Sequence, residues 1–439
     1  MKTDVCVIGA GPAGLMSAIF AAQNKAAVVV IEKNQAPGRK LLLTGGGRCN
    51  ITHTGTVDDF VRVYGKSGRF LRHCLHEFSP DATREFFGQI GIETKVDPTS
   101  LRYAEAGEQG CVFPVSERAG DVRDALLGEC LKLGVQFIFG RGADKIGKRG
   151  DSFSVFTGSE ITSASKVIIA TGGMSYPATG STGDGYKLAK SLRHTIIEPR
   201  PALVPLVSTE EWRAELAGIS RDNVTISAMV NKKKVSVSGP MLFTHDGISG
   251  PAVLDLSRLL VDCLSAIGFT DGETSPAAVR RGGPAKTPIE ITIDLVPAMN
   301  ESQLEEYLMG QLSQYSKKII ANVLFELAPK RLGGLICDLA GITETNASQL
   351  KKEQRRKVIQ LLKKLPVPIV ATKPIDEAIV TNGGVSTAGI DPTTMQSKVC
   401  PGLFFAGETI DVDGPCGGYN LQIAWSTGAL AGRKAAEDR

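Results

Sequence analysis

The feature that most constrains this chain is a strand, a glycine-rich turn and a helix that begin almost at its first residue. Val5 to Ile8 form a short apolar run, the turn Gly9 to Gly14 has the sequence GAGPAG, and apolar residues then recur at helical spacing. A second apolar run, Val28 to Ile31, ends at Glu32. The pattern G-x-G-x-x-G between a strand and a helix is typical of a dinucleotide-binding βαβ unit.

Each glycine of this turn has its own physical role. Gly9 allows the tight exit from the strand, Gly11 lets the backbone approach a pyrophosphate, and Gly14 lets the helix lie against the sheet. The free N–H groups and the positive dipole end of the helix face the phosphates. The carboxylate that closes the second strand is placed to accept from a ribose hydroxyl. FAD and NAD both remain open at this point. The contacts predicted here are Gly9, Gly11, Pro12, Ala13, Gly14 and Glu32.

A second glycine-rich loop follows, with the sequence TGGGRCN at residues 44–50. Backbone amides in such a loop can turn toward an anion or a planar ring. Four cations lie in or before this loop and suit a diphosphate, namely Lys33, Arg39, Lys40 and Arg48. The alternative for the first three is a basic loop exposed to solvent. The contacts predicted here are Lys33, Arg39, Lys40, Thr44, Gly46, Gly47, Arg48, Cys49 and Asn50.

Two later apolar strands also end in small residues. The first covers residues 165–171 and the second residues 402–406, and ligands bind at the carboxyl ends of such strands in open α/β folds. The second strand is followed by GGYNLQ at 417–422, the start of a helix whose amides would stabilise the negative charge of a reduced flavin. This favours FAD over a nicotinamide nucleotide. The contacts predicted here are Ala170, Thr171, Gly172, Gly407, Glu408, Gly417, Gly418, Tyr419, Asn420 and Leu421.

The 439 residues exceed what one hydrophobic core usually organises. Residues 194–298 alternate polar and apolar positions between glycine and proline turns, which predicts an inserted antiparallel β-barrel domain. Residues 299–368 have helical spacing and predict a small helical domain. Residues 1–193 and 369–439 then form an α/β, Rossmann-like three-layer FAD-binding domain.

Several longer motifs resemble one known family. They are GAGPAG at 9–14, TGGGRCN at 44–50, GCVFPVS at 110–116, IIATGGMSYPATGSTGDGYKLA at 168–189 and GLFFAGETIDVDGPCGGYNLQIAWSTG at 402–428. Together they resemble the aminoacetone oxidase and dehydro-bile-acid reductase family of FAD-binding proteins over nearly the whole chain. Two positions depart from the family pattern, because Cys111 stands where an Arg is expected and Cys416 stands where a small hydroxyl residue is expected.

The resemblance implies an FAD-dependent oxidoreductase that acts on a small organic or steroid-like molecule. The reaction would be amine oxidation with oxygen or NAD(P)H-driven reduction of a double bond. The resemblance also assigns an adenine contact to Ala143. No second G-x-G-x-x-G follows a strand, so NAD(P)H is expected to enter transiently at the substrate face.

Catalytic residues are expected at that face, where Arg48, Tyr176, His245, Asp246 and Tyr419 are the candidates. His245 would donate a proton near neutral pH, together with Tyr419. The alternative for His245 is a hydrogen-bonded residue of the barrel.

Composition and charge indicate which binding partners and which cellular compartment to expect. The net charge is +4, and the nine cysteines are scattered without a C-x-x-C, which predicts reduced thiols in the cytoplasm, no metal site and no redox dithiol. No stretch has the length of a membrane span. Seven cations at 351–364 form a basic helix, and the absence of interleaved aromatics favours a solvated surface. A flavoprotein of RNA modification and a non-catalytic FAD-binding module remain alternative functions, and no oligomeric state is predicted.

Overall fold

The computed structural model describes residues 1–97, 110–230, 232–266 and 288–437. Two compact units make up the chain, one from Met1–Pro201 with Ile375–Arg439 and the other from Ala202–Pro374. The units meet at 201/202 and 374/375, eight and six residues after the boundaries expected at 193/194 and 368/369. The division of the insert into two domains stays a prediction. The polar segment 270–286 within the insert lies outside the described residues.

The first unit is built on a seven-stranded sheet with the order β6-β2-β1-β9-β8-β7, and β18 also pairs with β9. Parallel pairing joins β6, β2, β1, β9 and β18, whereas β7 and β8 form an antiparallel hairpin onto β9. Continuous apolar runs fit this arrangement because strands of a parallel sheet are buried on both faces. The strands are β1 (Lys2–Ile8), β2 (Val28–Glu32), β6 (Gln136–Phe139), β7 (Lys145–Arg149), β8 (Ser152–Thr157), β9 (Glu160–Ile169) and β18 (Leu403–Phe405).

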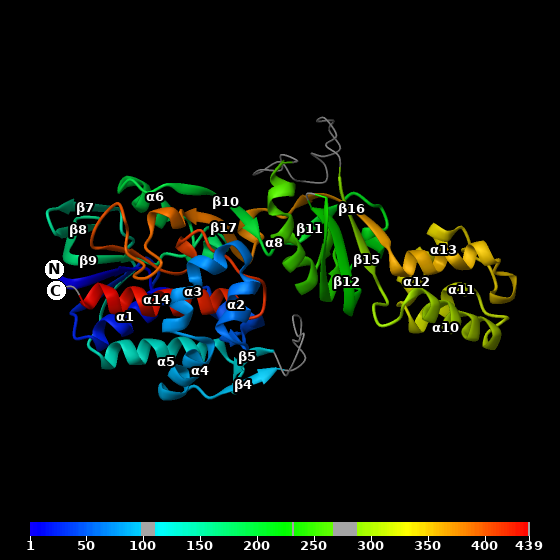
Figure 1. The fold of residues 1–439 in the computed structure, drawn as a ribbon, viewed down its shortest axis with the longest axis horizontal. Helices are drawn as coiled ribbons and strands as arrows, with labels where there is room; N and C mark the ends of the chain where they lie inside the picture. Colours follow the sequence, from blue (N-terminus) through cyan, green and yellow to red (C-terminus); the bar gives the residue numbers. More distant parts are fainter. Residues whose placement is uncertain (98–109, 231, 267–287, 438–439) are drawn as a thin grey trace. The chain divides into compact units, whose positions relative to one another are not determined.

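Helices α1 (Pro12–Gln23), α5 (Ala119–Lys132) and α14 (Tyr419–Glu437) gather beside this sheet, and α1 packs along α14 (Figure 1). Their apolar side chains share one core with the sheet. Helix α6 (Asp184–Ser191) contacts β7 and β17 (Val380–Val385), and β17 pairs with β10 (Ile196–Ala202). The strands expected at both ends of the chain therefore form one sheet, which confirms the predicted Rossmann-like domain.

A smaller three-stranded sheet with the order β3-β5-β4 belongs to the same unit. Its strands are β3 (Thr52–His53), β4 (Thr94–Asp97) and β5 (Cys111–Pro114), and the short helices nearby are α2 (Val57–Val63), α3 (Gly68–Glu77) and α4 (Pro80–Gln89). The sequence favours the start of α4 at this point, because Ser79 Oγ accepts from Ala82 N and Pro80 occupies the first turn.

The second unit contains a closed barrel with the strand order β11-β14-β13-β12-β15-β16, which confirms the predicted antiparallel barrel. One core links the barrel to helices α10 to α13, which gather at one end of it (Figure 1). The strands are β11 (Leu206–Ser208), β12 (Ser220–Val230), β13 (Lys233–Phe243), β14 (Gly247–Ser249), β15 (Ile289–Asp294) and β16 (Leu365–Thr372). The helices are α7 (Arg213–Leu216), α8 (Pro251–Ala266), α10 (Glu301–Gln314), α11 (Ile320–Val323), α12 (Lys330–Ala340) and α13 (Lys352–Lys363).

Two elements of this unit differ from the expectation. Strand β16, expected to lead back into the nucleotide domain from residue 369, instead pairs with both β11 and β15 and closes the barrel. Helix α8 interrupts a segment expected to be strands, because its apolar residues recur at helical spacing and pack on β12 and β13. None of the described helices is long and apolar enough to cross a membrane.

Candidate functional site

The turn between β1 and α1 has the geometry of a nucleotide cradle. Gly9 has a φ of 101°, and a side chain there would begin 2.5 Å from the carbonyl oxygen of Ala170. A side chain at Gly14 would begin 1.9 Å from the carbonyl oxygen of Gly9. Gly11 differs, because an added Cβ there meets no protein atom within 4 Å and no side chain caps α1. The first turn of α1 therefore offers the backbone N–H groups of Ala13 and Gly14 to a ligand, whereas Pro12 has no N–H to donate.

Glu32 closes β2 and organises the turn around it. Its carboxylate accepts from the amide of Ala10 at 2.8 Å and from the amide and side chain of Asn34 at 2.8 and 2.7 Å. An ionised carboxylate has about four acceptor positions, so a ribose hydroxyl can still be accepted. The amide of Arg141 donates to the Glu32 carbonyl at 3.2 Å, which brings the segment of Ala143 to the end of β2.

The second glycine loop, like the turn at Gly11, contains a glycine at which an added side chain would meet no protein atom. Gly45, Gly46 and Gly47 have φ values of 58°, 67° and 89°, and an added Cβ at Gly46 meets nothing within 4 Å. Thr44 Oγ1 donates to the Leu41 carbonyl, and the amide of Cys49 donates to the Thr44 carbonyl at 3.0 Å. Burial raises the pKa of the Cys49 thiol to about 12, so Cys49 packs as an inert side chain next to the half-buried Asn50.

The structure gives each predicted diphosphate cation a partner on the protein. Lys33 Nζ lies 2.7 Å from Asp184 Oδ2, and Arg39 Nη1 donates to Asn34 Oδ1 at 3.1 Å. The Arg48 guanidinium lies 4.2 Å from the centre of the Phe113 ring and pairs with Asp97 and Glu117 at 3.7 and 3.9 Å. A phosphate role for these side chains stays a prediction.

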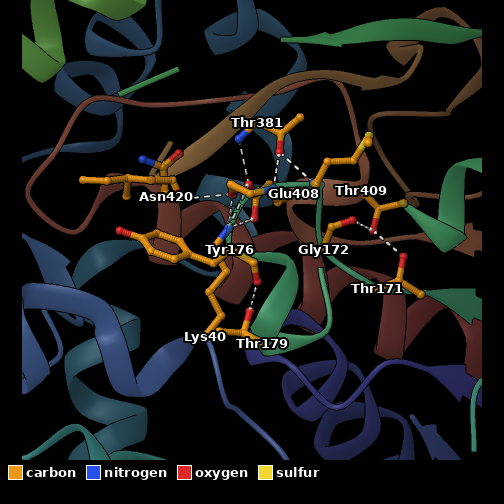
Figure 2. A network of polar contacts seen from close by, with 12 residues as sticks. Lys40, Thr171, Gly172, Tyr176, Thr179, Thr381, Glu408, Thr409 and Asn420 are labelled. Carbon is orange, nitrogen blue, oxygen red and sulfur yellow. Dashed lines mark hydrogen bonds and ion pairs between the residues drawn. The ribbon is translucent and has the colours of Figure 1, made fainter. Parts of the chain in front are cut away.

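Glu408 is the centre of a polar network that joins distant parts of the chain (Figure 2). Lys40 Nζ lies 2.8 and 3.1 Å from its two oxygens and also donates to Ser175 Oγ at 2.6 Å. The amide of Thr381 and the hydroxyl of Ser175 donate to Glu408 Oε1 at 2.8 and 3.2 Å. Thr381 Oγ1 in turn accepts from the amides of Met174 and Ser175. Lys40 is therefore bound to the acid at the end of β18.

This network predicts the effect of removing the cation. Lys40→Met leaves the Glu408 carboxylate, which is 22% exposed, with only two donors. We expect the free energy of unfolding to fall by about 1 to 3 kcal/mol, measured in urea at pH 7. Lys187→Met is the matched control, because the Lys187 side chain is 81% exposed and its pair with Asp184 spans 3.6 Å. Equal losses in the two variants would contradict this role of Lys40.

A buried tyrosine, Tyr186, lies within electrostatic range of Glu408. The Tyr186 hydroxyl is buried without a hydrogen-bond partner among the described residues. Burial first, and then the charges of Glu408 and Asp411, raise the pKa of Tyr186, so its hydroxyl stays protonated. Burial and the neighbouring Asp413 raise the pKa of Asp411. The Tyr186 hydroxyl therefore keeps its proton and can donate it to a water or ligand atom here.

The two ends of the chain meet at the edge of the sheet. The amide of Ala170 donates to the Ile8 carbonyl at 2.9 Å, and the Thr171 and Thr409 hydroxyls lie 3.4 Å apart. Thr409 Oγ1 also donates to the Gly172 carbonyl at 3.2 Å. A side chain at Gly407, where φ is 70°, would begin 2.7 Å from the Ala13 Cβ. The N-terminal turn and the C-terminal return are thus brought together, as predicted.

The start of α14 completes this edge. Gly417 and Gly418 have φ values of 106° and 97°, and the buried Tyr419 ring stacks on the His53 ring with 4.9 Å between their centres. The Asn420 side chain accepts from the amide of Gly414 at 2.9 Å and donates to its carbonyl at 2.8 Å. Leu421 is buried. The segment expected to face the flavin is therefore held rigidly.

The proposed proton donors belong to different units. His245 is exposed in the turn between β13 and β14 of the second unit, and its neighbour Asp246 pairs with Lys373 at 2.6 Å. Tyr419 belongs to the first unit, so the relation of His245 to it stays a prediction. Tyr176 adopts a left-handed backbone with φ of 51°, and its carbonyl accepts from the amide and hydroxyl of Thr179.

Two residues of the network were not among the predicted contacts. Ser175 lies within the family motif at 168–189, Thr381 opens the segment TNGGV at 381–385, and both residues donate to Glu408. Their partners lie 233 and 27 residues away, so residue type and spacing alone could not assign the pairs. The one signal that could have marked Ser175 and Thr381 as site residues was their position in these two segments.

These observations fit a dinucleotide cofactor. Open space for a ligand exists at Gly11 and Gly46, where a side chain would meet no protein atom, and α1 begins without a capping side chain. Acidic groups stand at the ends of β2 and β18, where ribose and ribityl hydroxyls require acceptors. The residues present therefore suit the group that the motifs predicted.

Comparison with known proteins identifies the family. The family described as HI0933-like protein Rossmann domain matches residues 3–434. The chain belongs to this family. It is 32% identical over 435 residues to the 3-dehydro-bile acid delta(4,6)-reductase of Clostridium scindens, with 98% of both chains covered. It is 30% identical over 429 residues to the ribosomal RNA dihydrouridine synthase of Escherichia coli, with 97% of this chain and 96% of that one covered.

Solved structures support the fold of the family. The 3-ketosteroid delta1-dehydrogenase of Sterolibacterium denitrificans aligns over 100% of both chains with a TM-score of 0.54 and 12% identity. A flavocytochrome c3 fumarate reductase aligns over 99% of this chain and 78% of its own, with a TM-score of 0.51 and 17% identity. Membership of the family confirms the predicted Rossmann nucleotide-binding fold and the predicted class of oxidoreductase.

Proposed function

We propose that this protein is an FAD-dependent reductase that saturates a carbon–carbon double bond conjugated to a carbonyl group, with NAD(P)H as the electron source. The observation that carries the proposal is the chemistry shared by its full-length relatives. One is named for reduction of a 3-dehydro bile acid at delta(4,6), and the other for forming dihydrouridine. A 3-oxo-4,6-diene and a uracil ring both contain a double bond conjugated to a carbonyl, so one reaction suits both substrates.

The geometry of the chain supports a site for each part of FAD. The amides at the start of α1 and the open turn at Gly11 would hold the diphosphate, and Glu32 would accept from the ribose. The glycine loop at 44–50 and Glu408 would lie along the ribityl chain and the ring. The start of α14 would face the pyrimidine end of the ring, where its dipole favours negative charge. When bound and reduced, the cofactor supplies a hydride to the substrate.

An anaerobic experiment tests the reaction class. We expect NAD(P)H to bleach the flavin absorbance of the purified protein, and a 3-oxo-4,6-diene steroid or uridine-containing RNA to restore it without oxygen. Reoxidation by oxygen alone, together with reduction by an amine, would support the amine oxidase alternative and contradict the proposal. A flavin that NAD(P)H cannot reduce would also contradict it, because no electrons would then reach the double bond.

A second substrate class, uridine within ribosomal RNA, is favoured by one surface of the second unit. On α13 and the residue before it, Lys351, Lys352, Arg356 and Lys357 are exposed and form no ion pair with described residues. The three other cations of this run are used inside the unit, because Lys363 pairs with Asp294 at 2.6 Å, Arg355 with Glu305 at 3.3 Å and Lys364 with Glu301 at 3.3 Å. The four exposed cations are therefore available to phosphates.

The salt dependence of RNA binding separates the two substrate classes. We expect Arg356→Gln with Lys357→Gln to reduce the slope of log K against log salt by about 0.7 to 0.9 for each RNA phosphate that the variant no longer neutralises. Lys132→Gln with Lys187→Gln is the control, because these lysines are 77% and 81% exposed in the first unit. Equal slopes for both double variants and the unaltered protein would leave the small-molecule substrate as the supported class.

A further inference from the structure

Three polar side chains lie in one row across the small sheet of the first unit. His53 of β3 pairs in register with Cys111 of β5, and Asp97 of β4 pairs with Cys111 from the other side. Residues directly opposite each other in an antiparallel sheet have their side chains on the same face, with Cβ atoms about 5 Å apart. The thiol of Cys111 therefore has an imidazole on one side and a carboxylate on the other. That carboxylate also pairs with Arg48 at 3.7 Å.

The start of α14 lies directly against this row. A side chain at Gly417 would begin 3.0 Å from Cys111 Sγ and 3.7 Å from His53 Cδ2. A side chain at Gly418 would begin 2.3 Å from the Thr52 carbonyl oxygen, so β3 packs on the backbone itself. Tyr419 stacks on His53 with an angle of 18° between the rings. Both glycines are thus needed for the thiol to touch the segment that leads into α14.

This environment suits a thiol that gives up its proton. The positive end of a helix dipole stabilises a thiolate, and a neighbouring neutral imidazole can take up the proton that the thiol gives up, whereas the Asp97 carboxylate opposes the negative charge. His53 Nδ1 lies 2.8 Å from the Thr54 carbonyl oxygen, and a carbonyl can only accept, so Nδ1 carries a proton and Nε2 is the basic nitrogen. Burial raises the pKa of Cys6, Cys74, Cys130 and Cys337 to about 12.

We propose that Cys111, supported by His53, is the catalytic acid that delivers a proton to the substrate carbon next to the carbonyl group. The inference rests on the proposed function, since it supplies the proton that double-bond reduction requires. The carbon–carbon π bond breaks and two C–H bonds form, one with the hydride from the reduced cofactor and one with the proton from Sγ. The resulting thiolate regains its proton from solvent through His53. The segment entering α14, which the proposed function places at the flavin ring, brings the thiol to the reacting face.

The role of Cys111 can be tested by measuring two half-reactions separately, namely reduction of the flavin by NAD(P)H and its reoxidation by the unsaturated substrate. In Cys111→Ser, we expect reduction of the flavin by NAD(P)H to stay within about twofold and reoxidation by the unsaturated substrate to slow by about 100-fold or more. His53→Phe keeps the ring that stacks on Tyr419 and should slow reoxidation by about tenfold. Cys416→Ser is the control, because this thiol is adjacent to Gly417 but outside the row, and it should leave both rates within about twofold. Unchanged reoxidation in Cys111→Ser would overturn the inference while the proposed function stands.

Alkylation supplies a test that needs neither a substrate nor a variant at position 111. In a Cys263→Ser, Cys416→Ser background, iodoacetamide labelling is followed by mass spectrometry at each remaining cysteine. Cys111 is itself buried, with 8% of its surface exposed, whereas Cys6, Cys74 and Cys130 are fully buried. We expect Cys111 to react faster than these three in the apoprotein, and bound FAD to slow its labelling by about tenfold or more. A labelling rate that FAD leaves unchanged would place the thiol away from the flavin and overturn the inference. If no unsaturated substrate reoxidises the unaltered enzyme, the proposed function fails, and protection of Cys111 then still reports whether the thiol lies at the cofactor.

Discussion

Gly11→Val is expected to abolish flavin binding while the first unit stays folded. The physical reason is that an added side chain at Gly11 meets no protein atom within 4 Å, so it would fill only space that the proposed ligand would occupy. The residue has φ of −76° and ψ of −176°, an extended conformation that valine adopts readily. Only the approach of a pyrophosphate to the backbone would be blocked.

The expected losses of stability and of FAD affinity differ in size, because the added side chain would meet the ligand and not the protein. Loss of glycine at the N-cap costs about 1 kcal/mol of stability at most. The affinity for FAD should fall by about 100-fold or more, which corresponds to about 2.7 kcal/mol. Equilibrium dialysis against FAD and urea unfolding of the apoprotein measure the two quantities. Gly128→Val is the matched control, because Gly128 is an exposed position of α5 where an added side chain also meets nothing within 4 Å.

Retained flavin in Gly11→Val would contradict the pyrophosphate approach. Loss of the folded state would contradict the geometry of the turn, since no protein atom stands in the way. A variant at Gly14 cannot make this distinction, because its side chain would begin 1.9 Å from the Gly9 carbonyl oxygen and disturb the turn with or without a ligand.

The local part of the site could be predicted because its signals lie within short stretches of sequence. The turn at Gly9 to Gly14, the acid Glu32 at the end of β2 and the glycines before α14 each depend on neighbours a few residues away. The sheet edges they occupy follow from the rule that ligands bind at the carboxyl ends of parallel strands. The structure joins the turn to Glu32, because the amide of Ala10 donates to the Glu32 carboxylate at 2.8 Å.

The pairings across the chain could not be predicted, because they depend on tertiary packing. Lys40 carries the same signal as the other cations of its loop, yet its partner Glu408 lies 368 residues away. Strand β16 has the apolar pattern of either domain, and only its pairing with β11 and β15 assigns it to the barrel. The row of His53, Cys111 and Asp97 likewise depends on register between three strands.

The crossing of α1 and α14 also depends on tertiary packing and could not be predicted from the sequence. It fixes the two ends of the proposed cofactor site relative to each other. A side chain at Gly428 would begin 2.5 Å from the Ala13 carbonyl oxygen and 3.0 Å from the Met16 Cβ. A side chain at Gly432, one turn later, would begin 2.3 Å from the Ser17 carbonyl oxygen. The helix that would hold the diphosphate and the helix that would face the flavin ring therefore touch through their backbones.

Gly428→Val is accordingly expected to destabilise the first unit by about 3 kcal/mol or more and to lower flavin affinity with it. The clash is with backbone atoms of α1, which cannot move aside as a side-chain tip can, so the helices must separate along a buried contact. Urea unfolding of the apoprotein and FAD affinity measured on the same preparation report both effects. Gly128→Val serves again as the control, since glycine and valine differ by only a few tenths of a kcal/mol in helix propensity. Stability and affinity equal to those of the control would show that the crossing tolerates a wider spacing, and that the two helix ends are positioned by other contacts.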